Sequence, residues 1–276
     1  MTQHLTDWIG KQETRKDVLS VQPARFMQAT LDHDPSLRAG DTLPTLWHWL
    51  YFLEAKRLSE LGRDAHSKKG GFLPPVELPR RMWAGGRLQF HAPLILGEPA
   101  EKTSTIKSVV EKTGKSGPLC FVTVEHLIHQ NGQLALSEEH DIVYRSDPAP
   151  DAPRPVLAPA PEAPDFSETV QPSEVILFRY SALTFNGHRI HYDVDYARSV
   201  EGYDGLVFHG PLTATLLANQ AETRSGKRLT TFTFTARAPL AGMTPFELQG
   251  RRSEQTHTLW ARRQDGACAM EATAGF

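Results

Sequence analysis

The 276-residue chain has few cysteines, no excess of charge of one sign and no long hydrophobic run. Its two cysteines, Cys120 and Cys268, form no metal-ligand spacing, so we interpret them as structural and expect a reducing compartment. A formal charge of −2, with basic residues clustered only in pairs, excludes the usual basic surface for nucleic acid. The charged N-terminus does not resemble a signal peptide, and no run approaches the roughly 18 apolar residues of a membrane helix. We therefore expect a soluble cytoplasmic protein that binds neither nucleic acid nor membrane.

Proline, by contrast, is abundant in one segment. Residues 147–172, "DPAPDAPRPVLAPAPEAPDFSETVQP", contain eight prolines among 26 residues and show no hydrophobic periodicity. Because proline lacks a backbone donor and favours extended geometry, this composition is typical of a linker that crosses a surface. We therefore expect an N-terminal unit at 1–146, a linker at 147–172 and a C-terminal unit at 173–276.

The two units carry matching segments in the same order. "RFMQAT" at 25–30 matches "RYSALT" at 179–184, and "FHAPLILG" at 90–97 matches "ARAPLAGM" at 236–243. Alternating, strand-like sequence follows each Ala-Pro-Leu segment, with hairpin signals such as Asn131-Gly132 between the strands. The matches indicate a duplicated fold, although two unrelated α+β domains with chance matches are the alternative.

A helix candidate precedes each shared Ala-Pro-Leu segment. The candidates lie at 45–61 and 210–222, and a proline stands near the start of each, as helix N-termini prefer. The sequence thus predicts an α+β fold of two repeats, each a long helix wrapped by an antiparallel sheet. We expect the two sheets to join edge to edge, because pairing covers strand edges that a single unit would expose.

Polar side chains are dense just before the second helix candidate. Asn186, His188 and His191 fall within six positions, inside the segment "RYSALTFNGHRIHYDVDYARSVEGYDGLVFHGPL". This segment resembles the hydratase motif of MaoC-like (R)-specific enoyl-thioester hydratases, in the branch of type 2 hydroxyacyl-thioester dehydratases and mesaconyl-CoA and itaconyl-CoA hydratases. "LPRRMWAGGRLQF" at 78–90 resembles the first half of that branch. The resemblance implies a double hotdog fold and an acyl-CoA substrate, with the first repeat shaping the acyl pocket and the second supplying the catalytic loop and helix.

His191 and Asn186 are the predicted catalytic residues. Adding water to a double bond conjugated to a thioester requires a base for the water, an acid for the α-carbon and donors for the enolate-like oxygen. His191 suits proton transfer because imidazole titrates near neutral pH. MaoC-like enzymes commonly carry an aspartate at the position of Asn186, whereas an amide can orient water but cannot take a proton. Either His191 moves the proton alone, or Asp193 or another carboxylate assists it.

The predicted substrate-binding residues belong to two groups. Gly210 opens the second helix, whose unpaired N–H groups suit a thioester oxygen, while His209 either orients the loop or lines the tunnel. Tyr192, directly after His191, is a further substrate-binding candidate. A second group of candidates lies at 78–90 and comprises Arg80, Arg81 and Trp83. The two arginines either form a solvated face or bind the second carboxylate of a short acyl chain such as mesaconyl or itaconyl.

No cofactor or metal is expected. The histidine pairs lack a wider ligand set, and the chain has neither a glycine-rich phosphate loop nor a nucleophile elbow. The leading hypothesis is a hydratase or dehydratase acting on a short, dicarboxylic enoyl-CoA. The alternatives are a 3-hydroxyacyl-thioester dehydratase of fatty-acid type and a thioesterase-like or acyl-thioester-binding hotdog protein, because this fold hosts several chemistries. A homo-oligomer is also possible on this sequence.

Overall fold

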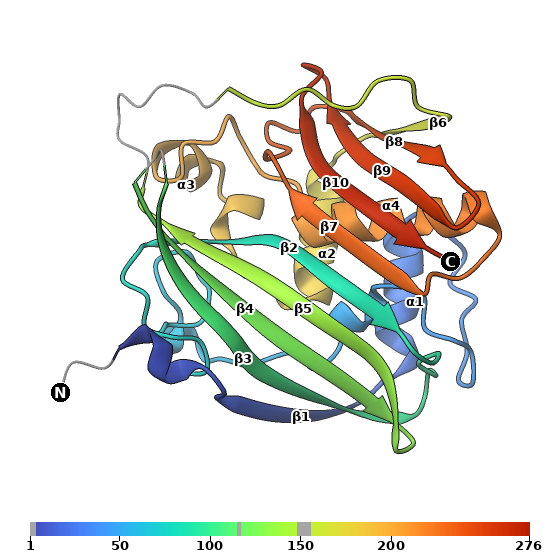
Figure 1. Ribbon diagram of the computed structural model, residues 1–276, viewed down its shortest axis with the longest axis horizontal. Helices are drawn as coiled ribbons and strands as arrows, with labels where there is room; N and C mark the ends of the chain where they lie inside the picture. The colour runs from blue at the N-terminus through green and yellow to red at the C-terminus, as the bar shows by residue number, and fades with distance from the viewer. Residues whose placement is uncertain (1–3, 115–116, 148–155) are drawn as a thin grey trace.

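In the computed structural model, which describes residues 4–114, 117–147 and 156–276, ten strands form a single antiparallel sheet (Figure 1). Their order across the sheet is β1-β3-β4-β5-β2-β7-β10-β9-β8-β6. The strands are β1 (Gln12–Val18), β2 (Arg80–Phe90), β3 (Pro99–Gly114), β4 (Gly117–Gln130), β5 (Gln133–Arg145), β6 (Phe166–Val170), β7 (Thr231–Ala236), β8 (Phe246–Arg252), β9 (Thr256–Arg263) and β10 (Cys268–Gly275).

The sheet is pseudo-symmetric about the pairing of β2 with β7. From this centre outward, the first half runs β2, β5, β4, β3 and β1, and the second half runs β7, β10, β9, β8 and β6 in equivalent order. The shared Ala-Pro-Leu segments begin just after the equivalent strands β2 and β7. The duplicated fold and the edge-to-edge joining of its sheets are therefore confirmed, as is the double hotdog fold class.

Glycine allows the two halves to approach at the centre of the sheet. Gly85 lies at a bulge in β2 and pairs with Thr235 of β7. A Cβ atom at Gly85 would lie 2.5 Å from the carbonyl oxygen of Phe234, and one at Gly86 would lie 2.8 Å from the Phe234 ring. The consecutive glycines of "WAGG" are thus required where one half of the sheet pairs with the other.

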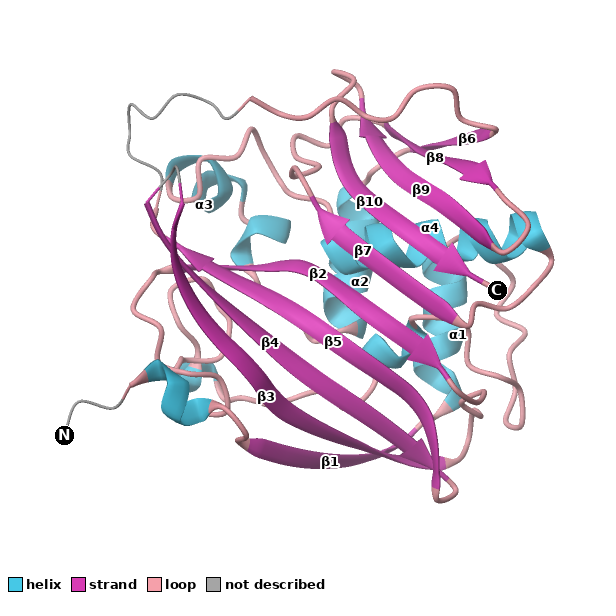
Figure 2. Cartoon of the chain, in the orientation of Figure 1, coloured by secondary structure: helices cyan, strands magenta, loops and turns pink. Residues whose placement is uncertain are grey.

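Helices α1, α2 and α4 gather on one face of the second half of the sheet, whereas α3, loops and short helical turns lie by the first half (Figure 2). The α-helices are α1 (Val21–Thr30), α2 (Glu174–Leu183), α3 (Val194–Ser199) and α4 (Gly210–Ser225), and the 3-10 turns are η1 (Leu5–Trp8), η2 (Trp47–Leu50), η3 (Leu58–Glu60) and η4 (Arg189–His191). Helix α4 confirms the helix expected at 210–222. Apolar residues surround it on most sides because the sheet wraps it. In the described part of the chain no helix is both long and apolar enough to cross a membrane.

The helix expected at 45–61 is absent. Residues in this range form only η2 and η3, and left-handed backbone at Leu46 (φ 68°) and Phe52 (φ 58°) flanks η2 on both sides. The apolar side chains of η2 enter the main core from a single turn, and the backbone N–H of Phe52 donates to Asp17 Oδ2 at 2.8 Å. Tertiary packing and this hydrogen bond therefore replace the regular helix that the apolar run predicts.

The predicted linker is wrong for five of its residues. Residues 166–170 form β6, which pairs with β8, and Phe166 is buried in the main core. Residues 148–155 of the linker lie outside the described part of the chain. The division into units at 1–146 and 173–276 otherwise stays a prediction.

Candidate active site

A cavity of about 1570 Å³ lies between the two halves of the molecule and receives side chains from both. β2 contributes Arg80, Arg81 and Trp83, the loop before η4 contributes Asn186 and His188, η4 contributes His191, and the start of α4 contributes Gly210. Most of the residues that the sequence predicts for the site are therefore brought to one cavity, although they lie more than a hundred positions apart in the chain.

His191 is buried and its ring is fixed by a backbone carbonyl. Only 7% of the residue is exposed, and Nδ1 lies 2.7 Å from the carbonyl oxygen of Val207. Because a carbonyl only accepts, Nδ1 carries the proton and the neutral ring has its lone pair on Nε2. Burial lowers the pKa of His191 to about 4, against the opposing effect of the Val207 carbonyl. The ring is thus a neutral acceptor near pH 7.

His209 supports the ring of His191. The two rings stack with centroids 3.6 Å apart and planes at 19°. Nε2 of His209 lies 2.9 Å from Ser181 Oγ, while its buried Nδ1 has no hydrogen-bond partner in the described part of the chain. Burial and the neighbouring His191 and His188 rings lower the pKa of His209 well below its ordinary value. His209, unlike His191, is not among the residues that line the cavity.

Asn186 folds the loop that carries these histidines. Its side-chain Oδ1 accepts a hydrogen bond from the backbone N–H of His188 at 3.0 Å, and its backbone N–H donates to the Ser181 carbonyl at 2.8 Å. One lone pair of the amide oxygen is therefore used within the loop. Asp193, the carboxylate considered as its substitute, caps α3 by accepting from Tyr196 N–H and pairs with Arg189. Asp193 does not line the cavity, so the structure does not bring it to His191.

The N-terminal turn of α4 borders the cavity through Gly210, Pro211 and Thr213. The first N–H groups of a helix have no acceptor within the helix, and its N-terminus carries partial positive charge. A Cβ atom at Gly210 would meet nothing within 4 Å. The Gly210 backbone is thus open on its cavity side, as the approach of a thioester oxygen requires.

The two arginines of β2 have different partners. Arg80 is 3% exposed, and its Nε lies 2.6 Å from Glu201 Oε2. Arg81 is half-buried and forms no ion pair with a carboxylate of the described residues. Trp83 packs against the His140 ring at 3.9 Å between centroids. Arg81 is therefore a guanidinium that the cavity offers to an anion, whereas the charge of Arg80 is already neutralised within the protein.

Tyr192, another predicted site residue, points away from the cavity. It is 56% exposed and does not line the cavity. The 3-10 turn of η4 explains this, because adjacent residues of a turn point in different directions and His191 takes the inward one.

His66, with its partner Asp64, was missed by the sequence analysis. Its Nδ1 lies 2.9 Å from Asp64 Oδ2, and its ring lies 4.3 Å from the ring of His188. Asp64 and His66 lie in the loop before β2, and their segment "RDAHS" has no residue spacing that indicates a site. Burial lowers the pKa of His66 and lowers that of His188 to about 2.

Asp64, His66 and His188 also have potential ligand atoms within 4.8 Å of one another, close enough to hold a metal ion. In this structure Nδ1 of His66 is already hydrogen-bonded to Asp64, so that nitrogen is not free for a metal. The expected absence of a metal stays a prediction.

The cavity wall supplied by the first half of the sheet is polar. Lys102, Ser104, His126 and His140 line it from β3, β4 and β5, and Ser104 Oγ lies 2.8 Å from His126 Nδ1. Burial lowers the pKa of His126 to about 3 and that of His140 to about 4, so both rings are neutral near pH 7. A long apolar acyl chain would leave Lys102 and His140, whose side chains make no hydrogen bond within the described residues, without partners, at a cost of about 1–3 kcal/mol each.

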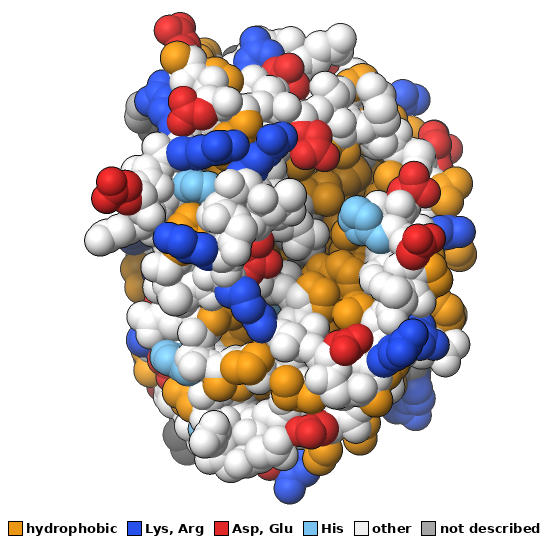
Figure 3. Space-filling view, turned by 90° about the vertical axis from the view of Figure 1, so that its right-hand side faces the viewer, with side chains coloured by type: hydrophobic (Ala, Val, Ile, Leu, Met, Phe, Trp, Pro, Cys, Tyr) orange, Lys and Arg blue, Asp and Glu red, His pale blue; other side chains and the backbone are white. Residues whose placement is uncertain are grey.

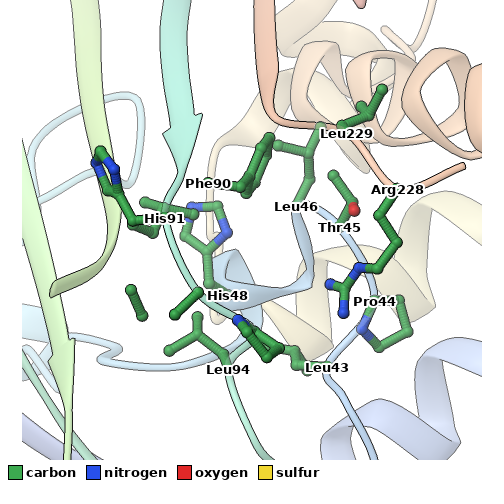
Figure 4. Close-up of a pocket in the computed structure, with 14 residues that line it drawn as sticks. Leu43, Pro44, Thr45, Leu46, His48, Phe90, His91, Leu94, Arg228 and Leu229 are labelled. Carbon is green, nitrogen blue, oxygen red and sulfur yellow. The ribbon is translucent and has the colours of Figure 1, made fainter. Parts of the chain in front are cut away.

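A second cavity of about 270 Å³ lies apart from the predicted site. Leu43, Leu46, Phe90 and Leu94 surround it, with the guanidinium of Arg228 at its side (Figure 4). Figure 3 shows that one face of the molecule is hollowed, with apolar side chains on the floor and charged side chains around it. None of the residues that the sequence predicts for the site lines this second cavity.

Comparison with known proteins identifies the family to which the chain belongs. The sequence model of the hydroxyacyl-thioester dehydratase type 2 family matches residues 46–242. The chain is 46% identical to a mesaconyl-C(4)-CoA hydratase of Chloroflexus aurantiacus over 96% of its own length and 95% of the relative's. It is 29% identical to a mitochondrial hydroxyacyl-thioester dehydratase type 2 of Schizosaccharomyces pombe, covering 90% and 92%. A solved MaoC-like dehydratase superposes with a TM-score of 0.74 at 15% identity, covering 98% of each chain.

These matches define an enzyme of the hydratase and dehydratase class on a double hotdog fold. The chain belongs to the hydroxyacyl-thioester dehydratase type 2 family.

Proposed function

We propose that this enzyme hydrates a short enoyl-CoA whose acyl chain carries a second carboxylate, of the mesaconyl-CoA or itaconyl-CoA type. The observation that carries the proposal is Arg81, a cavity arginine without an ion-pair partner among the described residues. Guanidinium groups match carboxylates in geometry, and a half-buried guanidinium gains most from an anion that occupies the same cavity. The 46% identity to a mesaconyl-C(4)-CoA hydratase supports the same substrate class.

The position of Arg81 fits the shape of such a substrate. In mesaconyl-C4-CoA the free carboxylate is attached to the β-carbon, the atom that receives the hydroxyl group. The anion-binding group must then lie close to the proton-transfer residues. The charge of Arg81 acts on Asp64, His66 and His188, which places it beside the histidines of the cavity.

The proposed reaction uses His191 as the proton carrier. As the water oxygen bonds to the β-carbon, one water O–H bond breaks and the proton passes to Nε2 of His191. The electron pair of the double bond moves onto the thioester oxygen, where the N-terminus of α4 at Gly210 stabilises the negative charge. The enolate then takes the proton from His191 at the α-carbon. His209 holds the His191 ring in place, and Asn186 shapes the loop and presents its remaining oxygen lone pair to the water.

A substitution at Arg81 tests the substrate class. Charged hydrogen bonds are worth about 1.5–3 kcal/mol, so Arg81→Ala should lower kcat/KM for mesaconyl-C4-CoA by about tenfold to 100-fold. Activity on 3-methylcrotonyl-CoA, in which a methyl group replaces the carboxylate, should be low and insensitive to the substitution. Arg87→Ala is the matched control, since Arg87 lies on the same strand but is exposed and paired with Asp141. An equal loss on both substrates would remove Arg81 from carboxylate recognition.

The second candidate is dehydration of a 3-hydroxyacyl thioester of fatty-acid type. It is favoured by the dehydratase named in the Schizosaccharomyces pombe relative and by the volume of the cavity. The polar wall of the cavity argues against it for long chains. A thioesterase-like function is distinguished by the release of free thiol. Cytoplasmic location and a homo-oligomeric state stay predictions.

A further inference from the structure

We propose that His66, oriented by Asp64, is a second catalytic residue that accepts a hydrogen bond from the attacking water, in the role that a carboxylate at position 186 would serve. The inference rests on the proposed hydratase function and concerns the same cavity. It assigns a chemical role to the first half of the molecule, in addition to shaping the acyl pocket.

The geometry of His66 is that of an oriented acceptor. Because Asp64 is ionised, Nδ1 of His66 donates to Asp64 Oδ2 at 2.9 Å, which leaves the lone pair on Nε2. Nε2 makes no hydrogen bond within the described residues, and His66 lines the cavity. A carboxylate behind an imidazole fixes its tautomer and makes the opposite nitrogen a stronger acceptor.

The loop of His66 packs against the loop that leads to His191 and is hydrogen-bonded to it. The Asp64 carbonyl accepts from the backbone N–H of Arg189 at 3.1 Å. A Cβ atom at Gly187 would lie 3.1 Å from the carbonyl oxygen of Ala65, so only glycine fits there without displacement. The rings of His66 and His188 are 4.3 Å apart, and those of His188 and His191 are 5.6 Å apart. His66 is thus held at the histidine group through the two residues that precede it, Asp64 and Ala65, which lie against the loop at 187–189.

A second acceptor is needed because Asn186 is a poor one. The water has two O–H bonds. His191 accepts the one that breaks, and the Asn186 oxygen and Nε2 of His66 share the other. Asn186 already uses one oxygen lone pair on the His188 N–H, and an amide has no proton affinity to match a carboxylate. As the water oxygen bonds to carbon, its remaining O–H becomes more acidic and its hydrogen bond to Nε2 of His66 strengthens. His66 therefore stabilises the transition state more than bound substrate.

The step balances without any further reactant. The water O–H bond directed at His191 breaks, the oxygen–β-carbon bond forms, and the double-bond electrons reach the thioester oxygen. The proton on His191 then bonds to the α-carbon. His66 keeps its own proton on Nδ1 throughout, and in the product it accepts from the new hydroxyl group.

The test combines substitution with rescue, measured on mesaconyl-C4-CoA hydration. His66→Ala should lower kcat by about 10²-fold with KM changed less than about threefold, since one lost transition-state hydrogen bond costs on that order. Asp64→Asn should lower kcat by about tenfold, because the amide no longer polarises the ring. In the doubly substituted His66→Ala, Asn186→Asp enzyme, the new carboxylate should raise kcat at least tenfold above His66→Ala alone. A purely structural role for His66 predicts no such rescue.

Two controls keep the outcome clear. His33→Ala removes an exposed histidine outside the cavity and should leave kcat unchanged. His66→Gln preserves side-chain volume, and urea unfolding of each variant shows whether the fold persists. A folded His66→Ala or His66→Gln enzyme with kcat within threefold of the parent overturns the inference. A parent enzyme that hydrates no enoyl-CoA overturns the proposed function instead.

Discussion

The buried ion pair between Arg80 and Glu201 should be the most costly single interaction to break near the site. Arg80 lies on β2, and Glu201 follows α3, so the pair joins the first half of the sheet to the segment that carries the catalytic loop. Both residues are at most 5% exposed, and Tyr196 OH also donates to Glu201 at 3.3 Å. Removing one partner leaves an uncompensated buried charge, which costs about 3–5 kcal/mol.

Urea unfolding measures the loss of stability when this ion pair, or an exposed one, is broken. Glu201→Ala should lower the free energy of unfolding by about 3–5 kcal/mol, whereas replacing both charges in Arg80→Met, Glu201→Leu should recover most of the loss. The reference is Arg237→Ala, which breaks a pair with Glu271 in which each side chain is more than 40% exposed and which should cost no more than about 1 kcal/mol. A Glu201→Ala cost no larger than that of Arg237→Ala would refute the reasoning.

Three further predictions follow from the same structure. His191→Ala should lower kcat by about 10² to 10⁴-fold with a modest change in KM, Asn186→Ala should lose less, and Asn186→Asp should stay partly active; steady-state kinetics of the three variants checks this. The pKa values of His191 (about 4) and His188 (about 2) lie below the unfolded value of about 6.5, so the unfolded chain takes up protons that the folded protein does not. The free energy of unfolding should therefore fall as the pH drops below 6.5. A urea midpoint independent of pH from 7 to 4 would contradict this. Gly85→Val should prevent folding or greatly lower the thermal midpoint, because its side chain would overlap the Phe234 carbonyl at the centre of the sheet.

The sequence allows the sheet to be predicted well because its signals are local. Alternating residues, Asn131-Gly132 and the matched Ala-Pro-Leu segments each specify a strand or turn without reference to distant residues. Helix α4 was predictable for the same reason, since proline stands at its start and a glycine, Gly226, ends it in left-handed backbone.

The expected helix at 45–61 fails because its apolar run is ambiguous. An apolar segment without clear periodicity is equally compatible with a helix and with an irregular buried segment. The left-handed residues Leu46 and Phe52 are specified by packing and by the carboxylate of Asp17, which lies 35 positions away in sequence. Such long-range determinants leave no local signal.

In the candidate site, too, residues within one motif were predictable from the sequence, and residues brought in by long-range packing were not. His191 and Asn186 stand in one continuous motif, so the sequence places them together. His66 and Asp64 reach the cavity only because their loop packs against residues 187–189, more than a hundred positions later. Likewise, the sequence shows two adjacent arginines but not that Arg80 pairs with Glu201 while Arg81 forms no ion pair within the described residues.

The most direct test of the central proposal is the reaction of the unmodified enzyme with matched thioesters. With mesaconyl-C4-CoA, the absorbance of the conjugated enoyl thioester should disappear while a thiol reagent detects no free CoA. With 3-methylcrotonyl-CoA the same change should be slower by at least about tenfold in kcat/KM, because Arg81 has no carboxylate to bind. Release of thiol in step with the absorbance loss, or faster turnover of 3-methylcrotonyl-CoA, would contradict a hydratase that recognises a dicarboxylic acyl group.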